Sequence, residues 1–188
     1  MKNFVKMAGG VDTAPLLLAI ARQPGLWDRH TERTAPEGSP HADVSDIWLR
    51  YNDIKPYKKS GDMSGFNEPH DAIFYPEWYA LPQVRPIVFG LMARVEATRL
   101  GGIMITKIPA GGRVLPHVDD NWHVHHYNTK LYVVLQSNPK CWNRVEDETV
   151  VMAPGDVWYF DNTKEHEVVN EGDIDRITLI VCMRCENK

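Results

Sequence analysis

The sequence contains little cysteine. It has 3 Cys in 188 residues, an odd number that argues against a disulfide scaffold and favours a reducing compartment. Cys182 and Cys185 form a CxxC close to the C-terminus. No helix follows to lower a thiol pKa, and no second pair is present to complete a zinc site. We therefore interpret the motif as two thiols at the end of a strand.

Long apolar runs and long basic runs are also lacking. The run Leu16–Ala21 is too short to span a membrane, and it lacks the charged start and cleavage site of a signal peptide. With a formal net charge of −4 and no basic run, the chain has no electrostatic footprint for nucleic acid. We expect a cytoplasmic protein that binds neither membrane nor nucleic acid, and the sequence leaves its oligomeric state open.

The length suits one domain with a sizeable core, so residues 1–188 are predicted to form a single domain. Residues 1–80 are rich in loops and are expected to form a cover or lid region. For residues 52–71 the alternative is an ordinary surface loop. Residues 81–98 are predicted to supply a supporting helix, and residues 99–185 the core that carries the chemistry.

Hydrophobic periodicity predicts a mainly β protein with flanking helices. Helices are expected at Pro15–Arg22 and Leu81–Glu96, and strands at Ser45–Tyr51, Gly102–Ile108, Lys130–Gln136, Thr149–Met152, Val157–Phe160 and Ile177–Met183. Several short strands after one helix favour a double-sheet jelly roll of the cupin-like kind, whose mouth holds metals and small ligands. The 6 Trp and 7 Tyr leave room for a rigid pocket.

Three residues have the composition and spacing of a facial iron site. His117 and Asp119 are separated by one residue, and His166 follows 49 positions after His117. Alternate residues of a strand point to the same face, so His117 and Asp119 can hold one ion. Two histidines and one carboxylate cover one face of an octahedron and leave open positions for a chelating cosubstrate and oxygen. Taken alone, each histidine would more often be a core or surface residue than a ligand.

Arg176 lies 10 residues after His166, in the last predicted strand pair. An inward-pointing arginine would be unfavourable unless it met a buried anion, and its planar guanidinium suits a carboxylate. A dicarboxylate cosubstrate would supply that anion. The alternative is a surface ion pair with Asp173 or Asp175.

The runs TKIPAGGRVLPHVDD and GDVWYFDNTKEHEVVNEGDIDR, together with the spacing of His166 and Arg176, resemble the aspartyl/asparaginyl β-hydroxylase family over about residues 99–183. The resemblance implies a double-stranded β-helix that uses Fe(II), 2-oxoglutarate and molecular oxygen. It implies His117 and His166 as iron ligands and Arg176 as the partner of the distal 2-oxoglutarate carboxylate. Some members bind iron with two histidines only, whereas Asp119 completes a full triad here.

The same resemblance places further residues near the cosubstrate. Thr106 stands where a hydroxyl residue assists the arginine, and its alternative is a plain strand threonine. Lys130, with Asn128 two residues before it, is nearest the position that meets the proximal carboxylate. Both are expected to bind the cofactor.

A histidine-rich stretch, Asn121–His126, directly follows the first ligands. Trp122 is expected to wall the substrate pocket and His125 to contact substrate, while a second metal site is the alternative. Asp161 and Asn162 could hold the imidazole of His166 through its other nitrogen, or could simply form a turn.

We therefore expect an Fe(II)/2-oxoglutarate-dependent dioxygenase that hydroxylates an amino-acid side chain, free or in a peptide, with His117, Asp119 and His166 as catalytic ligands. A metal-binding cupin-type enzyme or sugar-binding module that does not use 2-oxoglutarate is the alternative from the same fold. A non-enzymatic iron or oxygen sensor is the alternative from another class.

Overall fold

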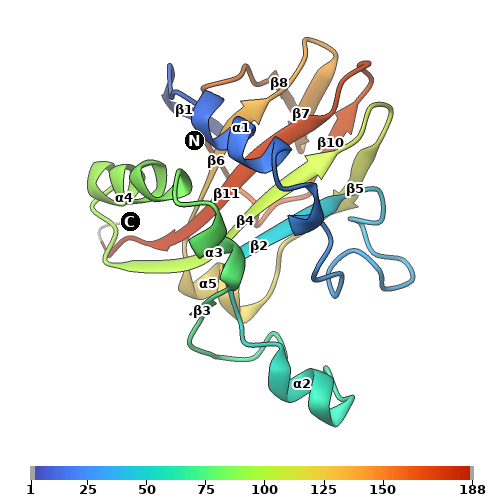
Figure 1. Cartoon of the computed structure of the whole chain (residues 1–188). Coiled ribbons are helices and arrows are strands. Elements are labelled where there is room, and N and C mark those ends of the chain that lie inside the picture. The colour runs from blue at the N-terminus through green and yellow to red at the C-terminus, as the bar shows by residue number, and fades with distance from the viewer. Residues whose placement is uncertain (1–2, 187–188) are drawn as a thin grey trace.

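The computed structural model describes residues 3–186, whose strands form two antiparallel sheets (Figure 1). The larger sheet has 7 strands in the order β1-β9-β6-β11-β4-β2-β3, and the smaller has 4 in the order β5-β10-β7-β8. The strands are β1 (Phe4–Ala8), β2 (Ser45–Tyr51), β3 (Ile73–Phe74), β4 (Arg99–Ile108), β5 (Arg113–His117), β6 (Thr129–Gln136), β7 (Cys141–Val145), β8 (Glu148–Val151), β9 (Val157–Phe160), β10 (His166–Asn170) and β11 (Arg176–Arg184).

Helices cover one face of the larger sheet (Figure 1). They are α1 (Ala14–Ala21), α3 (Pro76–Ala80) and α4 (Val84–Arg94), whereas α2 (Lys55–Ser60) and α5 (Trp122–His126) lie elsewhere. Alternate strand residues point into this helix layer, as in Leu131 and Val133 on β6 and Leu179 and Val181 on β11, all 0% exposed. The main apolar core therefore lies between the larger sheet and the helices.

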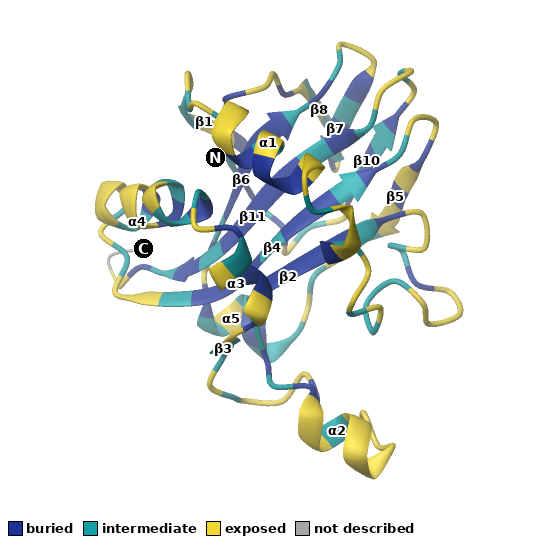
Figure 2. Cartoon of the chain, viewed as in Figure 1, coloured by how far each residue is buried: buried dark blue, intermediate teal, exposed yellow. Residues whose placement is uncertain are grey.

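The opposite face of the larger sheet packs on the smaller sheet. Tyr132 and Ile180 of the larger sheet belong to one apolar cluster with Val145 of β7, and Ile108 of β4 clusters with Val168 of β10. These residues alternate with those that face the helices, so the central strands are buried on both sides (Figure 2). The space between the two sheets holds the candidate site.

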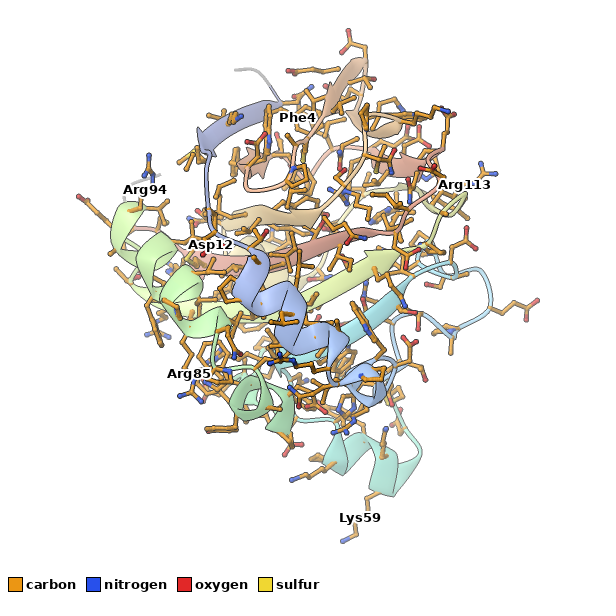
Figure 3. All side chains as sticks on the ribbon, turned by 45° about the horizontal axis from the view of Figure 1, so that its top comes forward. Phe4, Asp12, Lys59, Arg85, Arg94 and Arg113 are labelled. Atoms are coloured by element: carbon orange, nitrogen blue, oxygen red, sulfur yellow. The ribbon has the colours of Figure 1, made fainter. Side chains whose placement is uncertain are left out.

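The N-terminal 80 residues supply three strands of the larger sheet as well as loops. β1 pairs with β9 at one edge, and β2 and β3 form the other edge. The helix α2 projects from the body of the molecule, and Lys59 points away from it (Figures 2 and 3). Residues 1–80, which were predicted to form a cover or lid, therefore also contribute to the larger sheet.

Most predicted elements are present with shifted ends. β2 and β9 have the predicted bounds, whereas the helix predicted from Leu81 begins at Val84, because Pro82 lies in the turn after α3. The sequence prediction missed β1, β3 and β7 among the strands and α2, α3 and α5 among the helices, and it implied β5 and β10 at the histidine ligands without giving their bounds. None of the described helices is long and apolar enough to cross a membrane.

Candidate metal centre

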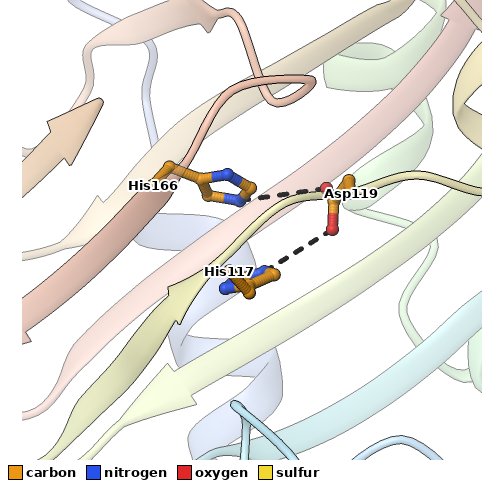
Figure 4. Close-up of side chains that lie close together, drawn as sticks. All are labelled: His117, Asp119 and His166. Carbon is orange, nitrogen blue, oxygen red and sulfur yellow. Dashed lines mark ion pairs between the residues drawn. The ribbon is translucent and has the colours of Figure 1, made fainter. Parts of the chain in front are cut away.

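The pairing of β5 with β10 brings the two predicted histidine ligands together. His117 is the last residue of β5, His166 is the first of β10, and the two are register partners with ring centroids 4.2 Å apart. Asp119 lies two residues beyond β5, where its backbone N–H donates to the Asn162 carbonyl at 3.1 Å. One potential donor atom from each side chain lies within 4.8 Å of the others (Figure 4). The predicted triad is assembled.

The hydrogen bonds of the two imidazoles fix which nitrogen faces the centre. Nδ1 of His117 lies 2.8 Å from the Leu115 carbonyl, and Nδ1 of His166 lies 2.9 Å from the Lys164 carbonyl. A carbonyl only accepts, so each Nδ1 carries the proton and each Nε2 keeps its lone pair. The Nε2 atoms are 3.5 Å and 3.9 Å from the Asp119 carboxylate oxygens. This is the tautomer that binds a metal through Nε2.

Burial keeps His166 neutral. Desolvation, and next the nearby Lys130 ammonium, lower the pKa of His166 to about 4. At neutral pH its imidazole is therefore uncharged and available as a ligand. Two imidazole nitrogens and one carboxylate form the donor set that suits Fe(II) with open positions, so the residues present fit that ion.

Asp119 is held as an anion by its neighbours. Lys130 Nζ lies 2.6 Å from Oδ2, and the Asn162 amide donates to the same oxygen at 2.9 Å. Burial alone would raise the pKa of the Asp119 carboxyl, but the adjacent Lys130 ammonium holds it well below its usual value. Asn162 thus lies in a turn, the alternative that the sequence left open, and its side chain positions Asp119 rather than His166. The His166 imidazole is held by a backbone carbonyl instead.

The triad lines a cavity of about 220 Å³ that also contains Arg176. Arg176 is 2% exposed; its Nη2 donates to Asn143 Oδ1 at 3.0 Å, and its guanidinium lies 5.5 Å from the centre of the Tyr132 ring. Its Nε has no hydrogen-bond partner in residues 3–186, and no described carboxylate forms an ion pair with it. The surface ion pair with Asp173 or Asp175 is absent from the described chain. A desolvated guanidinium without an anion indicates a binding site for one.

The comparison with family models decides the relationship. Residues 77–185 match the model described as aspartyl/asparaginyl beta-hydroxylase. The chain belongs to the aspartyl/asparaginyl β-hydroxylase family.

Individual relatives of this β-hydroxylase family member agree with that assignment. The chain is 32% identical over 71 residues to L-proline cis-3-hydroxylase 2 of a Streptomyces species, a match that spans 36% of this chain and 24% of that enzyme. The viral collagen prolyl hydroxylase vCPH of Paramecium Bursaria Chlorella virus-1, solved as a 2OG complex, superposes with a TM-score of 0.57 at 9% identity, covering 98% of this chain and 97% of that one.

A third similarity is to an oxidoreductase of the 2OG-Fe(II) oxygenase family from Burkholderia pseudomallei. The TM-score is 0.53 at 15% identity, with 87% of this chain and 76% of that chain covered. At these identities the two solved structures show a shared fold. The predicted family and the predicted jelly-roll fold are both confirmed, and the predicted metal and cosubstrate are those of this class of oxygenase.

The remaining predicted site residues of this β-hydroxylase family member divide into two groups. Thr106 and Lys130 line the cavity with Arg176. Asn128, Trp122 and His125 are not among its lining residues. The Asn128 side chain pairs with the Cys185 backbone, the Trp122 ring stacks on His126, and the exposed His125 pairs with Asp120. Neighbours in the same helix, His123 and Val124, line the cavity in their place.

Sequence reasoning missed four residues of the site. Tyr132 and Asn143 contact Arg176 from β6 and β7. Arg33 and His41 line the cavity from the loop before β2. A signal for Asn143 was present in the alternation of CWNRV, where a polar residue takes an inward position.

Acidification should destabilise this family member partly through His123. His123 is 6% exposed and its Nε2 accepts from the Gly102 N–H at 3.0 Å. Burial, followed by the nearby His70, lowers its pKa to about 3. Since the unfolded-state pKa is higher, the neutral form contributes stability above pH 6.5 that is lost as pH falls toward 3. The loss at pH 5.0 is about 2 kcal/mol.

Urea unfolding of the wild type and of His123→Gln at pH 7.5 and pH 5.0 measures this effect. Glutamine can still accept from Gly102 but does not titrate, so the variant should lose about 2 kcal/mol less on acidification. His125→Gln, a change at an exposed histidine, should show the wild-type pH dependence. If the wild type and His123→Gln lose the same free energy of unfolding between pH 7.5 and pH 5.0, the burial argument is wrong.

Proposed function

We propose that this protein is an Fe(II)- and 2-oxoglutarate-dependent hydroxylase that acts on an amino-acid side chain, free or in a peptide. The observation that supports it best is the presence, in one cavity, of the His117–Asp119–His166 donor set and the buried Arg176 without an anion. A cupin-type enzyme that did not use 2-oxoglutarate would have no use for that arginine. The hydroxylases among the relatives support the choice of reaction.

The metal would be held by Nε2 of His117, Nε2 of His166 and a carboxylate oxygen of Asp119. When bound, Fe(II) supplies the activation of oxygen, coupled to decarboxylation of 2-oxoglutarate, that hydroxylates an unactivated C–H bond. Lys130 and Asn162 both hold Oδ2 of Asp119, which leaves Oδ1 on the His117 side free to act as the ligand.

The cosubstrate would be fixed by side chains on the strands that line the cavity. Arg176 donates to the distal carboxylate with its planar guanidinium, and Asn143 and Tyr132 position that guanidinium. Thr106 is two residue pairs away in the β4–β11 register, where Thr178 is its partner, and it adds a hydroxyl to the same face. Apolar residues on the cavity wall, among them Met104, Val168 and Ile180, exclude water.

Substrate would bind in the part of the cavity that is lined by Tyr51, His123, Val124 and Tyr127, beside the residues that hold the metal and the cosubstrate. The three cysteines are free thiols, the form that a reducing compartment maintains. We keep the cytoplasm as the expected location.

An anaerobic titration tests the cofactors. We expect Fe(II) and 2-oxoglutarate together, and neither alone, to produce the visible metal-to-ligand charge-transfer band of a chelated cosubstrate. Glutarate, which has the same chain length but no keto group, should not produce it and serves as the control ligand. If Fe(II) binds but 2-oxoglutarate gives no band at saturating concentration, the oxygenase proposal is wrong and the cupin alternative takes its place.

A further inference from the structure

Arg33 brings a third cation into the cavity from outside the region that matches the family. It precedes residues 77–185, yet it lines the same cavity as the metal triad. Its Nε and Nη2 donate to the two oxygens of Asp46 at 2.9 Å and 2.6 Å, while Asp46 itself is 1% exposed on β2. This two-pronged contact fixes the plane of the guanidinium.

One nitrogen of Arg33 is left for a ligand. Nη1 has no hydrogen-bond partner in residues 3–186. It is also accessible, because the fully buried atoms without partners do not include it. The Arg33 side chain is 23% exposed, and Arg33 is one of the residues that line the cavity. A fixed cation with a free N–H donor therefore borders the space where substrate would lie.

The loop that carries Arg33 is held in place near the metal ligands. Ser39 Oγ–H donates to the Arg33 carbonyl at 2.7 Å, and the Leu115 N–H on β5 donates to the Pro40 carbonyl at 2.8 Å. His41 follows, with its ring centroid 4.8 Å from that of His117. Hydrogen bonds thus hold the loop to the strand that ends in a metal ligand, and Arg33 is a fixed part of the site.

The charges of the site leave room for one more anion. Its cations are Arg33, Lys130 and Arg176, and its carboxylates are Asp46 and Asp119. Among these five side chains the cations exceed the carboxylates by one. Fe(II) and dianionic 2-oxoglutarate neutralise each other, so loading both does not change the excess. A single carboxylate on the substrate would balance it.

Cavity size restricts the substrate as well. Pockets for drug-sized ligands measure about 300–1,000 Å³, whereas this cavity of about 220 Å³ must hold cosubstrate and substrate together. Only a small molecule, or the end of one side chain, fits beside 2-oxoglutarate.

We propose, building on the proposed function, that Arg33 binds a carboxylate of the substrate and that the part of the substrate inside the cavity is accordingly a small carboxylic acid or a carboxylate side chain. The carboxylate could come from a free amino acid or from the side chain of an aspartyl residue. Both sources present the same two oxygens to Nη1.

Turnover assays with matched acids and amides test this proposal. The probes are the free L-amino acids, L-proline among them, their α-amides, and N-acetyl-L-aspartyl amide, each assayed for substrate-dependent succinate formation. We expect either a free amino acid or the aspartyl amide to stimulate turnover, and the uncharged amide of the active compound to be at least about tenfold poorer. If no acid stimulates turnover, or an amide is as good as its acid, the proposal is wrong.

A pair of double variants separates Arg33 from its structural role. Arg33→Gln/Asp46→Asn removes both charges of the buried pair, so neither is left unpaired. Its KM for the active acid should rise roughly 10- to 100-fold, with a much smaller change in kcat and with no rise for the amide. Arg29→Gln/Glu77→Gln removes the neighbouring Arg29–Glu77 pair, which lies outside the cavity, and should keep the wild-type KM. An unchanged KM in the Arg33 variant would overturn the proposal.

Binding of Mn(II) and 2-oxoglutarate, followed by calorimetry, distinguishes this failure from failure of the proposed function. If both bind to the wild type and to the Arg33 variant while the acids fail, only the carboxylate proposal is lost. If 2-oxoglutarate does not bind to the wild type, the proposed function and the inference built on it fall together.

Discussion

Replacement of Arg176 by methionine is expected to weaken 2-oxoglutarate binding roughly 100- to 1,000-fold and, at the same time, to stabilise the protein without ligands. The first effect follows from the loss of a desolvated charge pair with the distal carboxylate. The second follows because Arg176 is 2% exposed and, within the described residues, has no ion-pair partner. An apolar side chain of similar length removes that desolvation penalty, and the free energy of unfolding should rise by about 1–2 kcal/mol.

Calorimetric titration with 2-oxoglutarate in the presence of Mn(II), together with urea unfolding, measures both effects. Arg144→Met is the matched control, since Arg144 lies on the outer side of β7 and pairs with Glu165 and Glu167. The control should keep the wild-type affinity for 2-oxoglutarate. If Arg176→Met unfolds more easily and binds 2-oxoglutarate normally, Arg176 is a structural residue and the cosubstrate lies elsewhere.

Replacement of His166 by alanine should weaken metal binding roughly a hundredfold or more, because one of three protein ligands is lost. Metal-dependent turnover should fall with it. His166 is 3% exposed and contacts His117 and Phe160, with ring centroids 4.2 Å and 5.2 Å away, so its removal also leaves a small cavity. The affinity for Mn(II) therefore has to be measured on protein shown by circular dichroism to be folded.

His125→Ala is the control for the metal experiment. His125 lies in the same histidine-rich stretch but is exposed and paired with Asp120. It should bind Mn(II) as the wild type does. An unchanged Mn(II) affinity in His166→Ala, or an equal loss in both variants, would contradict the proposed ligand set.

The metal ligands could be predicted from the sequence because they depend on local geometry. His117 and Asp119 are two residues apart at a strand end, and the last strands supply the partner His166 by simple antiparallel pairing. The bounds of β5 were not predicted, since Pro116 lies within it and Leu115 is exposed. A motif can thus be recognised even where the bounds of the element that carries it are not.

The contribution of the N-terminal loop could not be predicted in this way. Arg33 enters the cavity because Asp46, 13 residues later, is buried on β2 and needs a cation. Nothing in the pattern of Gln23–Asp43 distinguishes that arginine from Arg29, which pairs with Glu77 instead. Similarly, Lys130 contacts Asp119 across 11 residues. Such contacts depend on tertiary packing, which periodicity does not encode.

The residues proposed to bind the metal, the cosubstrate and the substrate come from three separate pieces of the chain. The smaller sheet and the turn after β5 carry the metal donors, the larger sheet carries Arg176 on β11, and the loop before β2 carries Arg33. Under the proposed roles, the residue that selects the substrate lies on a different piece of the chain from the residues that bind iron and 2-oxoglutarate. Changes in the loop could redirect the enzyme to a new acid while iron and 2-oxoglutarate remain in place, an architecture suited to rapid divergence of substrate preference.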